Sequence, residues 1–251
     1  MLGGLEGSRV LELGAGAGLA GLFAACHCDP SSVTLTERPH GELLSLLQRN
    51  AEAQRSIGGG DLHVRVLDWR SAPGVDQDAL ELMLGVGNDE REGERDEDGL
   101  GQGVPNGEGA GAAAVPELEL AAQFDIVLAS ECVYSWEAAL TLPCAVRAAL
   151  APGGRAVFVH IVREAAVQET LLAGLQAEGL RVAVREGAPS CQAGGSGMPG
   201  DVGRSGRFLL ILADRADAPA RVWAADSNGP APSAGLRWLR PGDDLAAAVG
   251  G

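Results

Sequence analysis

The feature that most constrains the fold is an apolar run that stops at closely spaced glycines, RVLELGAGAGLAG at residues 9–21. Apolar residues return at helical spacing directly afterwards, at Leu19, Leu22 and Phe23. Glycine lacks a Cβ atom and adopts positive φ without steric cost, so the chain can turn sharply there. The segment therefore predicts a strand, a tight loop and a helix, which is the opening unit of an α/β fold.

Two ligand-binding patterns fit this loop. Gly16 to Gly21 match the G-x-G-x-x-G pattern of dinucleotide-binding proteins, in which a pyrophosphate lies against the helix N-terminus. Glu12 to Gly18 match the E-x-G-x-G-x-G pattern of enzymes that use S-adenosylmethionine (SAM). Glu37 follows at about the 20-residue spacing of a ribose-binding acid and would suit either ligand. The loop by itself leaves both ligands open.

Strands and helices continue to alternate along the chain. The further expected elements are strands at 33–36, 62–67, 124–129, 155–161, 180–185 and 207–213, and helices at about 43–51, 136–150 and 164–178. The apolar run FDIVLA at 124–129 is typical of a strand buried on both faces of a parallel sheet. No helix separates the last two strands, so they should pair in antiparallel. We therefore predict an α/β fold, a single Rossmann-like doubly wound sheet of seven strands, mostly parallel with an antiparallel edge strand.

The domain organisation follows from changes in composition. Residues 1–213 should form one domain, and residues 214–251 an Ala/Pro/Gly-rich C-terminal tail. An acidic low-complexity insert at about 76–120 carries 13 acidic and 2 basic side chains, with too little apolar surface to offset its ordering entropy. We expect this insert to be disordered or loosely attached.

Composition also excludes classes of function. The chain has 19 basic residues, all arginine, and the absence of lysine excludes a P-loop, whose lysine reaches the phosphates. The net charge is −15, of which the insert contributes −11, and no basic run is present. Binding of nucleic acid through phosphate neutralisation is therefore not expected.

The compartment and metal content are predicted from the same composition. No stretch reaches the roughly 18 to 20 apolar residues of a membrane helix, and the N-terminus lacks a secretion signal, so we expect a soluble protein. Five cysteines without framework spacing favour a reducing compartment, cytoplasmic or nuclear. Cys26, His27 and Cys28 have no second cluster at ligand spacing, so no metal site is predicted. His160 in its apolar strand should be a buried core histidine.

Four segments carry a more specific resemblance: LEGSRVLELGAGAGLAGLFAA, VTLTERPHGELLSLLQRNAEA, VRVLDWR and FDIVLASECVYSWEAALTL. They resemble motifs of the seven-β-strand (class I) SAM-dependent methyltransferases that modify protein lysines, the methyltransferase-like 21 and calmodulin-lysine methyltransferase group (family 16). The similarity runs from about Leu5 to Ala213, interrupted by the insert. The order of five βα-type strands and a closing pair is that of this fold, and no second domain remains for a nicotinamide enzyme. The resemblance therefore favours SAM as the ligand.

The resemblance implies that the glycine loop holds the methionine part of SAM. Gly14, Gly16 and Gly18 would let the backbone pass close to this part, where a Cβ atom would collide. Glu12 would hold its amino end through water or a backbone amide. A solvated charge at the strand end is the alternative for Glu12.

The same resemblance assigns the rest of SAM to the next two strand ends. Glu37 would accept hydrogen bonds from both ribose hydroxyls with its two carboxylate oxygens, or be an exposed turn acid. Asp68 would accept from the adenine amino group. Trp69 would give apolar ring contact to the adenine, or be a plain core tryptophan.

The acceptor site is implied by Glu131-Cys132-Val133-Tyr134, which stands where the family has Asp-x-x-Tyr. Glu131 would accept hydrogen bonds from the substrate ammonium, and Tyr134 would contact the methylated nitrogen. Glu is one methylene longer than Asp, so a structural role for Glu131 is the alternative. The family usually carries some tens of residues before the glycine loop, and this sequence has about ten there, so its resemblance to the family is expected to exclude that segment.

The leading hypothesis is thus a SAM-dependent methyltransferase acting on a protein side chain, most simply lysine N6, with a protein substrate as partner. A catalytically silent interaction protein that keeps the fold is the first alternative. A methyltransferase for another acceptor is the second.

Overall fold

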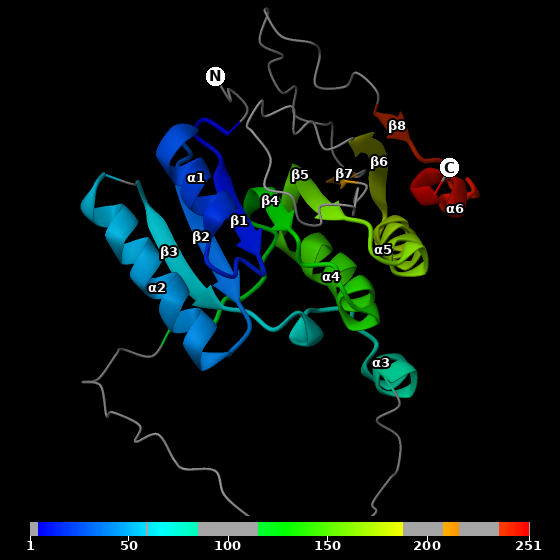
Figure 1. Cartoon of the computed structure of the whole chain (residues 1–251), viewed down its shortest axis with the longest axis horizontal. Coiled ribbons are helices and arrows are strands. Elements are labelled where there is room, and N and C mark those ends of the chain that lie inside the picture. Colours follow the sequence, from blue (N-terminus) through cyan, green and yellow to red (C-terminus); the bar gives the residue numbers. More distant parts are fainter. Residues whose placement is uncertain (1–4, 59, 85–114, 188–207, 216–235, 251) are drawn as a thin grey trace, which may run out of the picture.

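The computed structural model describes residues 5–58, 60–84, 115–187, 208–215 and 236–250, and within them a single sheet of the order β3-β2-β1-β4-β5-β7-β6-β8 (Figure 1). The strands are β1 (Arg9–Leu13), β2 (Ser32–Glu37), β3 (Leu62–Val66), β4 (Phe124–Ser130), β5 (Leu150–Ile161), β6 (Leu180–Gly187), β7 (Phe208–Arg215) and β8 (Arg237–Trp238). The helices are α1 (Leu19–His27), α2 (Gly41–Ser56), α3 (Gln77–Leu84), α4 (Trp136–Ala149), α5 (Ala165–Ala177) and α6 (Leu245–Gly250), with a 3-10 turn η1 (Trp69–Ser71).

The strand order reverses at β1. It pairs in parallel with β2 on one side, Val10 opposite Val33, and with β4 on the other, Val10 opposite Ile126. β3 and β5 extend the parallel sheet at its two sides, and β7 then joins β5 in antiparallel. In sheets of this kind, ligands bind beyond the carboxyl ends of the strands where the order reverses. The topology therefore predicts a ligand site at the carboxyl ends of β1 and β4.

Alternate residues of the central strands enter two separate hydrophobic cores. On β1, Leu11 and Leu13 join the larger core, while Val10 joins the smaller one. On β4, Val127 faces the larger core and Ile126 the smaller. Because successive side chains of a strand point to opposite faces, the two cores are the two faces of one sheet.

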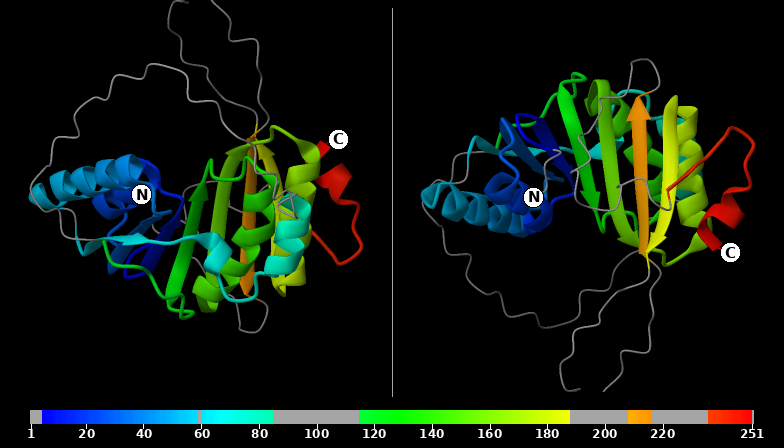
Figure 2. Two further views of the ribbon diagram at one scale, coloured as in Figure 1. Left: turned by 90° about the horizontal axis from the view of Figure 1, so that it is seen from below. Right: turned by 90° about the horizontal axis from the view of Figure 1, so that it is seen from above.

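The helices divide between these faces. Leu47 and Ala51 of α2 belong to the smaller core, and Leu142 of α4 and Leu171 of α5 to the larger one. Figures 1 and 2 show α1 and α2 beside β1, β2 and β3, and α4 and α5 along the β4 to β6 part of the sheet. The predicted doubly wound arrangement is confirmed.

Several element boundaries differ from the predictions. The described sheet has an eighth strand, because Arg237–Trp238 of the expected tail pairs in antiparallel with β6. β5 begins at Leu150 rather than at residue 155, because Leu150 already pairs with Phe124 of β4 and a bulge takes up the turn at Gly153. None of the described helices has the length and hydropathy to cross a bilayer.

The expectation of disorder over 76–120 is wrong at both ends of the segment. Gln77–Leu84 forms α3, and its Leu80 is buried. At the other end, Glu117 bridges in parallel to Val66 beside β3. The few apolar residues at each end are enough to dock these pieces, and residues 85–114 lie outside the described part.

Gly21 brings α1 into close contact with the sheet. A Cβ atom there would lie 2.3 Å from Leu35 Cδ2 and 2.7 Å from Glu12 Oε2. Leu35 is fully buried, so it has little room to move aside. The helix can lie at this depth only because residue 21 has no side chain.

We predict that Gly21→Ala lowers the free energy of unfolding by about 1–3 kcal/mol, the usual cost of overpacking a core. Urea denaturation measures it. Gly41→Ala is the matched control, because a Cβ atom at Gly41, the first residue of α2, meets nothing within 4 Å. Equal stability changes in the two variants would contradict the packing argument.

Candidate functional site

A cavity of about 460 Å³ lies at the carboxyl ends of β1 to β4. Its wall is built from residues that directly follow or end these strands: Gly14 and Gly16 after β1, Glu37 and Arg38 at β2, Leu67 to Trp69 after β3, and Glu131, Cys132, Tyr134 and Ser135 after β4. The start of α4 completes it with Glu137, Ala138 and Thr141. The cavity is therefore at the reversal of strand order.

The three loop glycines have different surroundings. Gly14 has φ +61°, and a Cβ atom there would lie 2.9 Å from the ring of Trp69 and 3.1 Å from Cys132 Cβ. Gly16 has φ +57° and faces open space in the cavity wall. Gly18 has φ +87° and is the N-cap of α1, where a Cβ atom would meet Leu47 at 2.8 Å. Gly18 thus serves the packing of α1 on α2 and is not part of the cavity wall.

Glu37 links the end of β2 to the glycine loop. Its Oε2 accepts from the backbone N–H of Gly16 at 2.8 Å, and its Oε1 accepts from the N–H of Arg38 at 3.0 Å. The residue is buried but lines the cavity. Each carboxylate oxygen can accept more than one hydrogen bond, so Glu37 keeps acceptor capacity toward the cavity.

Glu12 lies behind the loop and does not line the cavity. It is 2% exposed, and its Oε2 accepts from the backbone N–H of Gly21 at 2.9 Å, in the first turn of α1. Burial raises the pKa of Glu12 to about 7, against the opposing hydrogen bonds from Gly21 and Ala20. Glu12 thus fixes the helix behind the loop, and the alternative of a solvated charge is wrong; its indirect contact with a ligand through water or a backbone amide stays a prediction.

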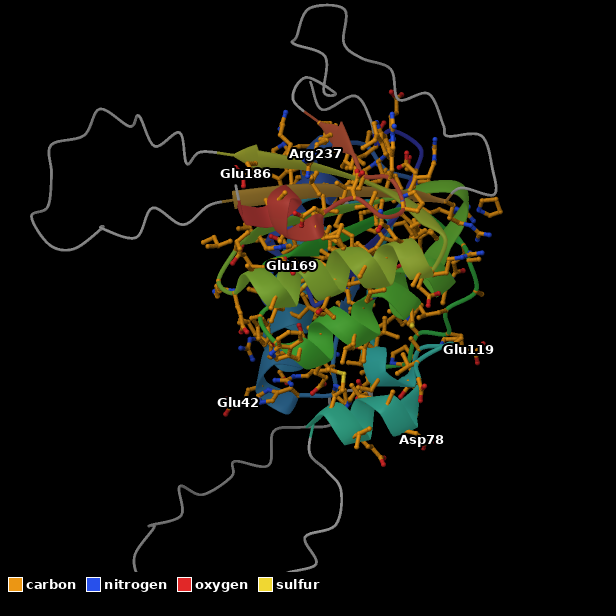
Figure 3. All side chains as sticks on the ribbon, turned by 90° about the vertical axis from the view of Figure 1, so that its right-hand side faces the viewer. Glu42, Asp78, Glu119, Glu169, Glu186 and Arg237 are labelled. Carbon is orange, nitrogen blue, oxygen red and sulfur yellow. The ribbon has the colours of Figure 1, made fainter. Side chains whose placement is uncertain are left out.

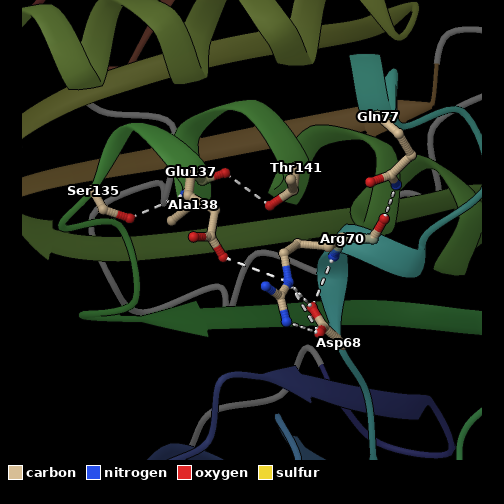
Figure 4. Close-up of polar contacts among 7 residues, drawn as sticks. All are labelled: Asp68, Arg70, Gln77, Ser135, Glu137, Ala138 and Thr141. Atoms are coloured by element: carbon tan, nitrogen blue, oxygen red, sulfur yellow. Dashed lines mark hydrogen bonds and ion pairs between the residues drawn. The ribbon is translucent and has the colours of Figure 1, made fainter. Parts of the chain in front are cut away.

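Asp68 belongs to a charged network with Arg70 and Glu137 (Figure 4). Arg70 donates to Asp68 Oδ2 at 2.6 Å, and the hydrogen bond lowers the pKa of Asp68. Nε of Arg70 also lies 3.8 Å from Glu137 at the start of α4. The Arg70 carbonyl accepts from Gln77 at the start of α3. The network therefore connects η1 with α4 and α3, and Asp68 is ionised.

Trp69 fills the space over the glycine loop. Its ring is the nearest group to the missing Cβ of Gly14, and it packs partly buried against the larger core. It also lines the cavity. Trp69 thus has the core contacts of the one interpretation from the sequence, and the ring contact with a ligand stays a prediction.

Glu131 ends β4 in a backbone conformation that is rare for a residue with a side chain, φ +53°. Its N–H donates to the carbonyl of Val159, and its Oε1 accepts from the N–H of Ile161 at 2.6 Å. Oε2 accepts from the guanidinium of Arg163 at 2.9 Å. The carboxylate is 39% exposed and lines the cavity. Glu131 is thus held by the chain's own donors in a strained position at the cavity.

Tyr134 and Cys132 are placed very differently in the same wall. Tyr134 is 62% exposed, at the cavity edge just before α4. Cys132 is buried, and desolvation raises its pKa to about 12. Its thiol is therefore protonated at neutral pH and is a poor nucleophile.

Sequence reasoning missed the arginines of this site. Arg38 lines the cavity, while Arg70 and Arg163 pair with predicted site carboxylates. The pairing of Arg70 could have been predicted from its place two residues after Asp68. The pairing of Arg163 could not, because it lies 32 residues from Glu131 in the sequence. Ser135, the N-cap of α4, was missed as well; its hydroxyl accepts from the N–H of Ala138.

Two further predictions from the sequence concern His160 and metal binding. His160 is fully buried on β5, with Nε2 hydrogen-bonded to Gln168, as expected for a core histidine. Burial lowers its pKa, so it is neutral. Within the described ranges, no group of His, Cys, Asp and Glu side chains could hold a metal ion.

Comparison with known proteins gives a family model that matches part of the chain, and solved structures that share its fold. The model of a family described as lysine methyltransferase matches residues 3–86, which include the glycine loop, Glu37 and Trp69. The match ends before Glu131 and Tyr134. A search of curated proteins finds no match.

Three of the solved structures that match this chain come from work on methyltransferases. One is the complex between the Trm112 methyltransferase activator and a methyltransferase of Haloferax volcanii, with 16% identity, 84% of this chain and 83% of that chain covered, and a TM-score of 0.50. A SAM-dependent methyltransferase from Mesorhizobium loti has 17% identity, 86% and 94% coverage and a TM-score of 0.49. This chain spans 50% of the CurJ carbon methyltransferase chain, with 86% of its own length covered, 15% identity and a TM-score of 0.45.

The fold and the family match together imply SAM as the cofactor. The cavity wall agrees with this ligand in its own chemistry. Gly14 and Gly16 leave the backbone open to close approach, and Glu37 presents a carboxylate at the end of β2.

The raised pKa of Glu12 predicts a specific pH dependence of stability. The folded chain binds this proton more tightly than the unfolded chain does, so the contribution of Glu12 to stability falls as pH rises toward 7. Compared with Glu12→Gln, the wild type should lose about 2 kcal/mol of unfolding free energy between pH 5.5 and 8.5. Urea titrations of both proteins at the two pH values measure the difference. A difference that stays constant would show that Glu12 is ionised throughout.

Proposed function

We propose that this chain is a SAM-dependent methyltransferase that transfers a methyl group to a protein side chain, lysine N6. One observation carries the proposal. Five of the residues predicted for the cofactor and both of those predicted for the acceptor, from four different strand ends, line one cavity: Gly14, Gly16, Glu37, Asp68 and Trp69, with Glu131 and Tyr134. A donor and an acceptor group bound there would lie close together, which is what a transfer in one step requires.

The cofactor would be held along the β1 to β3 side of the cavity. Gly14 and Gly16 would lie against its amino-acid part, and Glu37 would accept from its ribose hydroxyls. Asp68 and Trp69 would flank its adenine. Bound SAM would supply a methyl group on a sulfonium centre that is already electrophilic.

The acceptor would enter past β4 and α4. Glu131 would place a negative charge near an amine whose nitrogen becomes positive as the new bond forms. Tyr134 would orient this nitrogen with its hydroxyl or its ring face. The exposure of Tyr134 at the cavity edge suits an acceptor on a large substrate, which must reach the site from solvent.

A lysine acceptor is supported by two observations. The matching family model is described as lysine methyltransferase, although its match covers the cofactor half. The acceptor half supplies a carboxylate and an exposed tyrosine, groups that suit an amine. The chain itself contains no lysine, so any methyl-lysine formed in an assay must come from the substrate.

The cofactor site is tested by calorimetric titration with SAM and with its demethylated product, S-adenosylhomocysteine. Micromolar binding is expected. Glu37→Gln should weaken it about tenfold or more, because a charged acceptor of hydroxyl hydrogen bonds is lost. Glu42→Gln is the matched control, since Glu42 points away from the body at the start of α2 (Figure 3) and should bind as the wild type does. A folded wild type that binds neither compound would favour the silent interaction protein.

The acceptor side is tested with Tyr134→Phe. Removal of the hydroxyl alone should slow methyl transfer to lysine-containing protein by about tenfold through poorer alignment. Binding of S-adenosylhomocysteine should change by less than about twofold, because the hydroxyl is expected to touch the acceptor and not the cofactor. Transfer is followed with SAM labelled in its methyl group, and methyl-lysine is identified by mass spectrometry. Methylation of another residue type would reject lysine as the acceptor.

A further inference from the structure

The carboxylate of Glu131 already has a cation of its own. Arg163 donates to its Oε2 at 2.9 Å from the short connection between β5 and α5. His160, which lies nearby on β5, is buried and neutral, so Arg163 supplies the positive charge in the described contacts of Glu131. An ammonium group that approaches Glu131 therefore meets a guanidinium at the same carboxylate.

The two groups that hold Glu131 are not equally mobile. The N–H of Ile161 is part of the backbone of β5, which pairs with β4 and β7. Arg163 is a long side chain with 52% of its surface exposed, and exposed ion pairs of this kind are held weakly. Arg163 can thus turn away while Ile161 keeps the carboxylate in place.

The displaced guanidinium would remain close to the incoming amine. With the screening of bulk water, two like charges about 3–4 Å apart repel enough to weaken binding by about five- to tenfold. The repulsion also acts on the charge that grows on the amine during transfer. An acidic side chain next to the acceptor lysine would pair with Arg163 and so remove this repulsion.

We infer that Arg163 is a specificity-determining residue that selects lysines with an acidic neighbour in the substrate. The substrate lysine pairs with Glu131, and the neighbouring carboxylate of the substrate pairs with Arg163. One ion pair within the enzyme is thus exchanged for two between enzyme and substrate. This inference rests on the proposed function. It names a substrate class, acidic segments that contain lysine, although the enzyme itself is strongly acidic.

The test uses short peptides with one central lysine that differ only in the two flanking residues, Glu, Gln or Arg. Methyl incorporation from labelled SAM is measured for the wild type, Arg163→Gln and Arg163→Glu. The wild type should prefer Glu-flanked over Gln-flanked peptides by about five- to tenfold. Arg163→Gln should lose this preference, and Arg163→Glu should favour Arg-flanked peptides.

Two controls accompany the test. Arg237→Gln changes an arginine on β8, at the far edge of the sheet, and should keep the wild-type preference (Figure 3). Calorimetry with S-adenosylhomocysteine should give the same affinity for every variant. Binding of the fluorescent peptides is measured by anisotropy in the presence of S-adenosylhomocysteine. Their affinities should follow the same order as their methylation rates, so this measurement shows the preference without turnover.

The possible failures are distinct. Wild-type methylation without an acidic preference would overturn this inference alone, as would a preference that survives in Arg163→Gln. Binding of S-adenosylhomocysteine with neither methylation nor binding of any peptide would overturn both this inference and the lysine acceptor. Inverted selectivity in Arg163→Glu would be the strongest support.

Discussion

The arrangement of the site depends on the buried contact between Glu12 and the first turn of α1. The carboxylate accepts from the N–H of Gly21, and the missing side chain at Gly21 lets the helix approach this closely. The helix in turn fixes the end of the glycine loop. From there the N–H of Gly16 reaches Glu37 at the end of β2. One buried carboxylate, whose own ionisation is costly, thus sets the wall on which a ligand would lie.

Arginine pairing gives the rest of the cavity its electrostatic character. Asp68 is held by Arg70 and Glu131 by Arg163. The planar guanidinium suits such pairs because it offers several donors in a fixed geometry. Arg70 also extends toward Glu137 and so connects η1, which follows Asp68, to α4 (Figure 4). These pairs bring an arginine next to each of the two carboxylates.

Much of the site could be predicted because parallel strands end at one edge of a sheet. Gly14, Glu37, Trp69 and Glu131 follow or end four different strands, and the topology brings them to one cavity. The alternative of a solvated charge for Glu12 was wrong, because the packing of α1 on the sheet buries this carboxylate. The proposed roles of the site residues remain predictions.

The sequence by itself determined the α/β class, the glycine turn and the strand ends that carry functional side chains, because these depend on local periodicity and on glycine's freedom at positive φ. Only the tertiary structure decided which carboxylate meets which cation. Arg163 is 32 residues from Glu131 and reaches it only because β4 and β5 are neighbours in the sheet. Burial of Glu12 and exposure of Tyr134 were decided in the same way, since desolvation depends on packing between segments that are distant in the chain.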